Sequence, residues 1–305
     1  MVLLREIETA KPLAIEWPTV VLMASTYALL ALLLWFFTRL PWWVASPIGA
    51  YLVALHGSLQ HEALHGHPTR NRLVNELLVS INPSLWFPYR RYRKLHLTHH
   101  NDEHLTDPQL DPESYYVLPG RWAALPAPMK QLYTLNNTLG GRMIMGPLIA
   151  MIRFWTSEAS AMIKGDREVL QAWLLHIPAC VVTLVYALWI CGIPFWQYVL
   201  CLAYPGIALM LVRSFCEHQA AEKEGERTII VEASPFWALL FLNNNLHVAH
   251  HTRPRLPWYE LPAYYRSERD GLIAKNNGYR MNGYGEIFRR YFFRPKEPVA
   301  HPLIK

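Results

Sequence analysis

The 305-residue sequence predicts an all-α integral membrane protein, with four transmembrane helices in two hairpins and a helical cap on one side of the membrane. Its composition is one observation that predicts this class, because 52% of the residues are hydrophobic and the 12 Trp and 16 Tyr are many for a soluble chain. The second observation is that the apolar residues are concentrated in four runs. The third is that histidines closely follow two of these runs and recur in two further motifs outside them.

The first predicted hairpin covers residues 18–60. The run 18–37 carries no charge, and as a helix it is long enough to cross about 30 Å of hydrocarbon. The run 41–60 follows after only three residues, so a tight turn must join the two. This second run ends directly at His61.

The second predicted hairpin consists of the runs 169–190 and 195–215, joined by a short turn that contains Gly192 and Pro194. It brings Glu217 and His218 to the same side of the membrane as the end of the first hairpin. Four spans place both termini on one side.

The distribution of charge predicts which side this is. Lys and Arg number 12 between His61 and Arg167 and 13 from Glu217 onward, whereas the two opposite turns contain only Arg39. The positive-inside rule therefore predicts a cytosolic cap, cytosolic termini and, in a bacterium, an inner-membrane location. The net charge of +6 needs no nucleic-acid partner. We attribute the basic stretch 90–94 to anionic headgroups or topology, with a solvated basic face as the alternative.

The remaining segments are expected to lie at the membrane surface. Between the hairpins, residues 68–165 contain several prolines and apolar patches, which predict short interfacial helices. Residues 1–17 carry charges and do not resemble a removable signal peptide, so we interpret them as an interfacial lead-in. No repeat or linker divides the chain, and we predict one membrane domain over residues 1–305.

Three motifs contain eight of the 14 histidines: HEALH at 61–65, HLTHH at 96–100 and HVAHH at 247–251. Their spacing of three or four residues brings side chains to one face of a helix. Histidine is the commonest metal ligand, and eight imidazoles exceed the four ligands of a tetrahedral zinc ion. The alternative, ordinary histidines on solvated helices, does not explain three such motifs. The sequence therefore predicts that the cap holds a histidine-rich site for two metal ions.

The order of these motifs resembles that of the membrane fatty-acid desaturase and hydroxylase superfamily, over about residues 15–265. The resemblance implies four spans with a cytosolic cap, and a non-haem diiron centre (Fe²⁺/Fe³⁺) that activates dioxygen. It also implies that a further histidine follows the fourth span, where this chain has His218. The implied iron ligands are His61, His65, His96, His99, His100, His218, His247, His250 and His251.

The chain departs from the family pattern at one position, and the sequence does not decide the roles of several residues near the motifs. Some desaturases have an asparagine one helical turn before the histidine that follows the last span, but this chain has Ser214. His67 and His104 lie beside the motifs without matching a ligand position, and the remaining histidines, His56, His176 and His301, are interpreted as structural. Five acidic residues are candidates to orient imidazoles or to serve only as caps and solubilising groups; they are Glu62, Asp102, Glu103, Asp107 and Glu217. Asn243, Asn244 and Asn245 either contact the site or begin the helix that carries the third motif.

Ligand type alone does not choose among iron, copper and zinc. With the diiron centre that the resemblance implies, we expect hydrogen abstraction from a lipid acyl chain, giving a double bond or, by hydroxylation, an alcohol. A carotenoid substrate is an alternative, because carotenoid ketolases share similar motifs and an ending like PWYELP at 257–262. A carboxylate-bridged diiron bundle would need two Glu-x-x-His pairs, and only Glu62 with His65 fits. A non-catalytic, zinc-binding membrane protein is the alternative from another class.

The predicted reaction needs electrons from outside the chain. The sequence contains no iron–sulfur motif, no GxGxxG fingerprint and no HPGG motif of a fused cytochrome b5. We therefore expect a separate electron donor of the ferredoxin, rubredoxin or cytochrome type.

Overall fold

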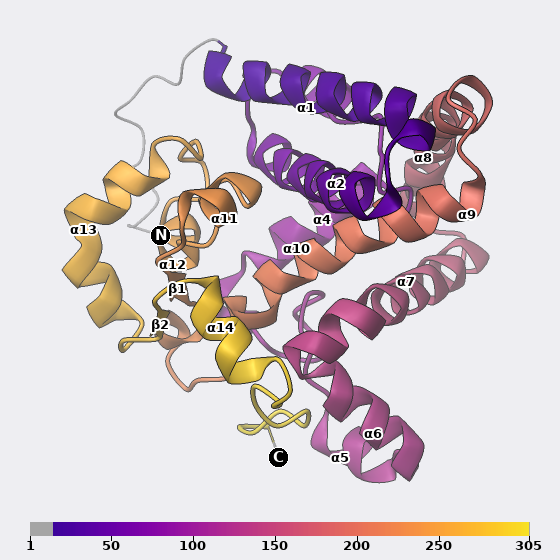
Figure 1. Cartoon of the computed structure of the whole chain (residues 1–305). Helices are drawn as coiled ribbons and strands as arrows, with labels where there is room; N and C mark the ends of the chain where they lie inside the picture. Colours follow the sequence, from indigo (N-terminus) through magenta and orange to yellow (C-terminus); the bar gives the residue numbers. More distant parts are fainter. Residues whose placement is uncertain (1–14, 305) are drawn as a thin grey trace.

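The computed structural model describes residues 15–304, so most of the predicted lead-in at residues 1–17 lies outside the described residues. Each of the four apolar runs forms a helix, and the four pack together as shown in Figure 1. These helices are α1 (Trp17–Phe36), α2 (Trp42–His65), α8 (Arg167–Leu184) and α10 (Tyr204–Glu217), the last preceded by the short α9 (Phe195–Tyr198). Short turns join α1 to α2 and α8 to α9, as the hairpin prediction requires.

Two π-helical segments interrupt the second hairpin. Val185–Ile190 extends α8, and Val199–Ala203 joins α9 to α10. The second segment lies just before Pro205, which has no backbone N–H to donate to the carbonyl of Cys201 four residues earlier. The Ser46 hydroxyl of α2 donates to that carbonyl instead, at 2.7 Å. The neighbouring helix therefore supplies the hydrogen bond that this carbonyl lacks within its own helix.

Three segments are long and apolar enough to cross a membrane: Trp17–Arg39, Arg167–Ile190 and Phe195–Glu217. The helix α2 has 24 residues and a length of about 36 Å, but it does not belong to this set. Its second half contains polar residues such as His56, Ser58 and Gln60, and all three are buried in the bundle. A helix that other helices surround need not be apolar throughout. The fourth crossing and the sidedness of the bundle stay predictions.

Glycines let α2 and α10 approach closely. A Cβ atom at Gly206 of α10 would lie 2.4 Å from Val53 Cγ1 of α2, and one at Gly49 of α2 would lie 1.9 Å from Leu202 Cδ2 in the π-helical segment before α10. Both distances are shorter than van der Waals contact, so a larger residue at either position would force its neighbours to shift. This close packing brings the end of α2, which carries His61, and the end of α10, which His218 follows, to the same side of the bundle.

The segment between the hairpins contains five α-helices: α3 (Arg72–Leu78), α4 (Tyr89–His99), α5 (Pro119–Ala124), α6 (Ala127–Asn136) and α7 (Leu139–Ile163), with a 3-10 turn at Asp102–His104. The expectation of short helices is wrong for α7, which has 25 residues and packs along α10. The prolines on which that expectation rested run from Pro83 to Pro128 and all precede this helix. Thr138 caps its start by accepting a hydrogen bond from Gly141 N at 3.0 Å, and Pro147 is accommodated inside it.

The residues after α10 form the cap. Its elements are a 3-10 turn (Glu224–Arg227), β1 (Ile230–Val231), α11 (Pro235–Leu240), α12 (His247–Thr252), α13 (Leu261–Lys275), β2 (Arg280–Met281) and α14 (Tyr284–Tyr291), with β1 parallel to β2. Backbone bonds fix the start of α12: Val231 N donates to Asn245 O at 2.8 Å, and Val248 N donates to Ile229 O at 3.1 Å.

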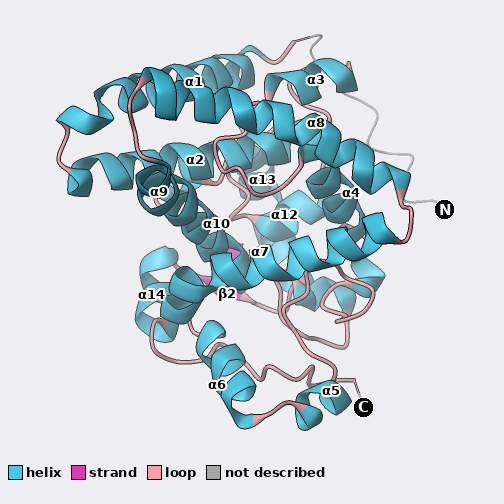
Figure 2. Ribbon diagram, turned by 90° about the vertical axis from the view of Figure 1, so that its right-hand side faces the viewer, coloured by secondary structure: helices cyan, strands magenta, loops and turns pink. Residues whose placement is uncertain are grey.

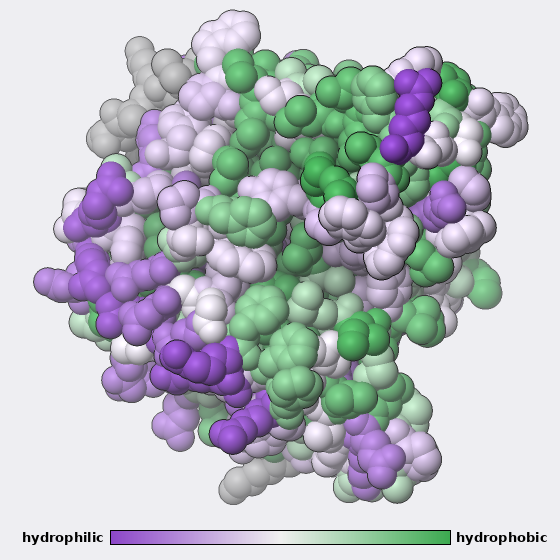
Figure 3. All heavy atoms as spheres, in the orientation of Figure 1, coloured by the Kyte–Doolittle hydropathy of each residue, from purple (hydrophilic) through white to green (hydrophobic). Residues whose placement is uncertain are grey.

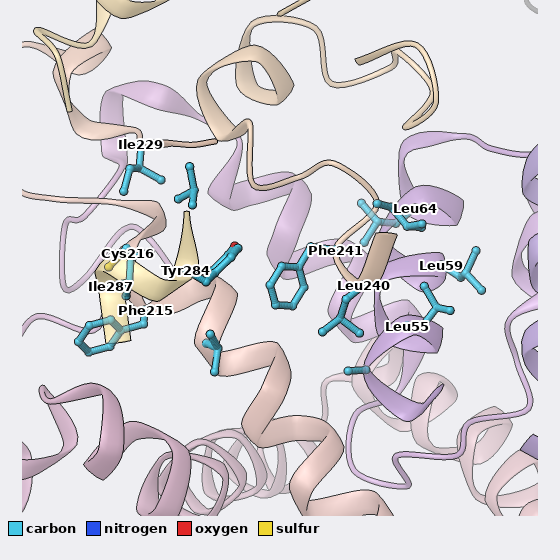
Figure 4. Packing of buried hydrophobic residues seen from close by; sticks show 14 of the residues in the cluster. Leu55, Leu59, Leu64, Phe215, Cys216, Ile229, Leu240, Phe241, Tyr284 and Ile287 are labelled. Atoms are coloured by element: carbon cyan, nitrogen blue, oxygen red, sulfur yellow. The ribbon is translucent and has the colours of Figure 1, made fainter. Parts of the chain in front are cut away.

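A hydrophobic core joins the cap to the bundle. Leu59 of α2, Phe215 of α10, Phe241 after α11, and Tyr284 and Ile287 of α14 are all buried in one cluster (Figure 4). Burying a large apolar side chain stabilises a fold by about 1.5–3 kcal/mol, so this cluster holds the cap firmly on the ends of the helices.

The surface is divided into two parts. Hydrophobic residues cover much of the helical bundle at the upper right of Figure 3, and hydrophilic residues cover the region of α13 at its left. Large apolar side chains are exposed along α1 and α8, among them Leu32 (55%), Leu174 (60%) and Val182 (53%). Such a surface is unfavourable in water and is typical of contact with lipid.

Candidate metal centre

The nine histidines that the motifs and the resemblance predict as ligands gather at the junction of the bundle and the cap. They come from the end of α2, from α4 and the residue after it, from the residue after α10, and from α12. They form two groups. The five-histidine group consists of His61, His65, His96, His100 and His250, and the four-histidine group consists of His99, His218, His247 and His251. In each group, one nitrogen from every ring lies within 4.8 Å of the others.

The Nε2 atoms have the spacing of ligands around one ion. In the five-histidine group, His96 Nε2 lies 3.0 Å from the Nε2 atoms of both His61 and His100. In the four-histidine group, His218 Nε2 lies 3.0 Å from His99 Nε2 and 3.1 Å from His247 Nε2. Metal–nitrogen bonds of about 2.1 Å give an octahedron with edges of about 3.0 Å. Each group can therefore surround one metal ion.

The two HxxHH motifs each contribute to both groups. On α4 and α12 adjacent residues point about 100° apart, so His99 and His100 turn toward different groups. His250 and His251 do the same on α12. The rings of His100 and His251 stack with centroids 4.3 Å apart, so the two groups adjoin.

Hydrogen bonds at Nδ1 set the direction of three rings. His96 Nδ1 donates to Glu113 Oε1 at 2.9 Å, and His99 Nδ1 donates to Asp111 Oδ1 at 2.8 Å. An ionised carboxylate only accepts hydrogen bonds, so the proton lies on Nδ1 and the lone pair of Nε2 points into the group. The Asn244 amide oxygen accepts from His247 Nδ1 in the same way, at 2.9 Å. Such outer partners commonly orient metal-binding histidines.

The electrostatics of the two groups favour neutral ligands around a cation. Burial lowers the pKa of His100, His218, His247 and His250, which keeps these rings in the neutral form that binds metal. His99 differs, because the Glu113 and Asp111 carboxylates outweigh its burial and raise its pKa to about 9.

A metal ion would provide a partner for a ring nitrogen that otherwise has none. His65 Nε2 is buried and has no hydrogen-bond partner. His96 and His99, whose Nδ1 atoms face carboxylates, turn their Nε2 atoms toward other ring nitrogens at 3.0 Å, as ligands around one cation do. Among the described residues both groups contain histidine only, a donor set that suits iron, copper or zinc. Five nitrogens in one group exceed the tetrahedral shell that zinc prefers.

Two of the acidic residues that the sequence offered lie close to the histidines. Glu217 Oε1 lies 2.8 Å from Arg213 Nε and 3.7 Å from His247 Nδ1, so it pairs mainly with the arginine. Glu62 Oε2 accepts a hydrogen bond from Trp258 N at 3.2 Å, which ties α2 to the cap. Glu62 belongs to neither group, and the carboxylate-bridged design finds no support among the described residues.

The sequence did not single out the two carboxylates that accept from the imidazoles, Asp111 and Glu113. They follow the second motif by about a dozen residues, in a turn where the chain doubles back over α4. Nearer candidates act otherwise: Asp107 accepts from two backbone N–H groups in its own turn, and Glu103 is exposed. The side chain of Asp102 lies outside the described part of the structure.

The three consecutive asparagines have different roles, which the sequence left open. The Asn244 side chain contacts the site, with its oxygen on His247 and its nitrogen 3.4 Å from His61 Nε2. Asn243 Nδ2 donates to Trp258 O at 2.8 Å, and Asn245 Nδ2 donates to Val231 O at 2.7 Å. These two bonds hold the turn before α12.

The other residues that the sequence left in doubt lie outside both groups. His67 Nδ1 pairs with Glu16 Oε1 at 2.6 Å, and His104 belongs to neither group of the described residues. Ser214 Oγ lies 3.3 Å from the Tyr115 hydroxyl. The three histidines interpreted as structural, His56, His176 and His301, have a hydroxyl or backbone carbonyl within hydrogen-bond distance.

Comparison with known proteins identifies the family. No curated protein matches the chain. The family model described as "Fatty acid desaturase" matches residues 37–284, which is more than half of the chain and includes all nine histidines of the two groups. The match confirms the resemblance that the three motifs predicted. The chain therefore belongs to the fatty acid desaturase family.

Proposed function

We propose that this protein is a membrane-bound diiron oxidoreductase that uses dioxygen to introduce a double bond into a fatty acyl chain of a lipid or thioester. Membership of the fatty acid desaturase family implies an oxidoreductase that acts on lipids. The observation that carries the proposal is the pair of adjoining histidine groups, each with the nitrogen spacing of one metal ion.

The five-histidine group would hold one iron ion and the four-histidine group the other. When bound, the pair of ions would use dioxygen to remove hydrogen from an unactivated carbon–hydrogen bond. The protein's own part is to keep the rings in place: Glu113, Asp111 and Asn244 fix the ring orientations through Nδ1. The four-histidine group offers fewer nitrogens, so more positions at its ion remain for other ligands.

The balance of the reaction requires an electron donor. Forming a double bond removes two hydrogen atoms from the acyl chain, whereas reducing dioxygen to two waters takes four electrons and four protons. The other two electrons and two protons must be supplied by the donor and the solvent. We propose that the donor is a separate ferredoxin, rubredoxin or cytochrome that docks from the cytosol. We also propose that this chain crosses the membrane four times, with both of its termini on the cytosolic side. The abundance of Lys and Arg on the histidine side of the predicted spans supports this orientation.

Mass spectrometry of host membrane lipids tests the proposal. Cells supplied with iron and oxygen would express the wild type, His99→Ala or the matched control His104→Ala, whose histidine lies outside both groups. Acyl chains that lose two hydrogens with the wild type and the control, but not with His99→Ala, would support desaturation.

Other outcomes would replace the proposal. Acyl chains that gain one oxygen atom would indicate a hydroxylase. A change confined to carotenoids would indicate the ketolase-like alternative. Purified protein that holds only zinc and consumes no oxygen with any lipid would favour the non-catalytic alternative.

A further inference from the structure

A basic cavity lies on the face of α4 opposite the histidines. It has a volume of about 400 Å³ and lies between α3, α4 and the beginning of α8, three elements that are neighbours in Figure 2. Five cationic side chains line it, together with one carboxylate, Glu168; the cationic residues are Arg72, Arg90, Arg91, Arg93 and Lys94. None of these residues belongs to the candidate metal centre.

Three of the five cations already have carboxylate partners. Arg91 forms a two-pronged pair with the buried Glu158, with both Nε–O distances at 2.9 Å. Glu76 Oε1 lies 2.5 Å from Arg90 Nε, and Lys94 pairs with Glu168. These three charges are therefore largely balanced within the protein.

Arg72 and Arg93 are the two cations of the cavity that form no ion pair with a carboxylate among residues 15–304. They belong to different helices, yet they lie close enough to affect each other. Burial, and then the charge of Arg72, lowers the pKa of Arg93. Two guanidinium groups that face one cavity and repel each other form a site for an anion, and the oxygens of phosphate, like those of a carboxylate, match the planar fork of a guanidinium.

The surroundings of the cavity place it at the level of a membrane surface. The candidate span Arg167–Ile190 begins at its edge. Apolar side chains are exposed on the helices that form it, including Leu73 (62%) and Leu77 (71%) on α3 and Leu170 (47%) on α8. A short helix with exposed leucines beside a cluster of arginines is typical of a segment in the headgroup region, where anionic lipids attract Lys and Arg side chains.

We propose that Arg72 and Arg93 bind the phosphate of an anionic phospholipid headgroup, whose acyl chains lie along the exposed apolar face of α8. Each guanidinium donates hydrogen bonds to phosphate oxygens, which removes the repulsion between the two arginines. A soluble phosphate compound shares the headgroup chemistry but gains nothing from the leucines around the cavity. The site holds a structural or regulatory lipid and does not depend on which reaction the metal centre carries out.

Native mass spectrometry of the full-length protein in detergent tests this site, with phosphatidylglycerol and phosphatidylcholine as the added lipids. The double variant R72Q/R93Q removes the two uncompensated charges. The matched control R289Q/R290Q removes two exposed charges of α14, away from the cavity. We expect R72Q/R93Q to weaken phosphatidylglycerol binding about tenfold or more, the control to change it less than about threefold, and phosphatidylcholine to bind more weakly than phosphatidylglycerol to the wild type. Wild-type affinity in R72Q/R93Q would overturn the proposal.

Two further measurements complete the test. Glycerol 1-phosphate added in the same titration separates the sources of phosphate: competition at concentrations similar to those of the lipid would identify a soluble ligand and overturn the lipid assignment. If R72Q/R93Q fails to fold, the wild type is cross-linked to phosphatidylglycerol that carries a photoreactive headgroup. Cross-links within residues 72–97 and 168–172 would support the site, and cross-links confined to other segments would contradict it.

Discussion

The two histidine groups share α4 and α12 but differ in the third element that completes them. Two residues near the end of α2, His61 and His65, complete the five-histidine group, and both are buried in a helix that the bundle surrounds. A single residue, His218, completes the four-histidine group from extended backbone just after α10. The comparison teaches that one group has five candidate ligands, two of them on a rigid helix, whereas the other has four and no candidate ligand to spare.

The largest expected difference between the groups comes from removing one ligand from each. His99→Ala leaves three nitrogens in its group, whereas His65→Ala leaves four, which is a complete tetrahedral shell. We expect His99→Ala to lose lipid-modifying activity to background and to retain about one iron ion per chain. His65→Ala should retain more iron. Metal analysis of the purified variants measures the difference, and equal losses of iron would contradict the unequal roles of the groups.

Removing the metals from the wild type should lower its thermal stability. An ion that binds only the folded state at 100 times its dissociation constant stabilises the protein by about 2.7 kcal/mol. Chelation should therefore lower the unfolding temperature, and it should lower that of His99→Ala less, because this variant has one ion fewer to lose. Thermal unfolding in detergent, before and after chelation and after iron is restored, provides the measurement. An unfolding temperature that does not change on chelation in either protein would contradict metal binding by both groups.

A smaller effect is expected from the carboxylates that accept from Nδ1. Removing such an outer partner commonly costs about 10–100-fold in metal affinity or activity. Glu113→Gln should weaken the five-histidine group, and Asp111→Asn the four-histidine group. Asp111 should matter more, because its Oδ2 also accepts from Thr106 N at 2.9 Å and no spare ligand protects its group. Iron titration of each variant tests this order, with the exposed Glu103→Gln as the control; a stronger effect of Glu113→Gln would reverse it.

The gathering of the eight motif histidines could be predicted because it depends on local spacing, and the family resemblance added His218. Three or four residues between histidines place them on one face of a helix whatever the rest of the fold does, and all nine predicted histidines lie in the two groups. The division into five and four could not be predicted. It depends on how α4 and α12 are rotated toward each other, which long-range packing decides. The roles of Asp111 and Asn244 could not be predicted either, because they depend on the conformations of loops.

The helices likewise have features that the local sequence predicts and features that depend on long-range packing. Apolar runs and short turns predicted the four helices and their hairpins, because a continuous apolar stretch is a local signal. The burial of α2 is not local: its polar residues are covered by helices far away in the sequence, such as α10. The length of α7 was missed because the prolines before it suggested breaks, although Thr138 supplies a cap and a long helix follows.

The smallest expected effect concerns Ser214, where some members of the family have an asparagine. The Ser214 hydroxyl lies 3.3 Å from that of Tyr115 and 3.5 Å from Leu211 O, and the residue belongs to neither histidine group. We therefore expect Ser214→Ala to retain wild-type iron content and to change activity less than about threefold, whereas ligand variants lose both. Iron analysis and lipid mass spectrometry of Ser214→Ala beside His99→Ala make the comparison. A loss of iron from Ser214→Ala would show that the four-histidine group depends on a fifth residue, and that the two groups are more alike than their histidines indicate.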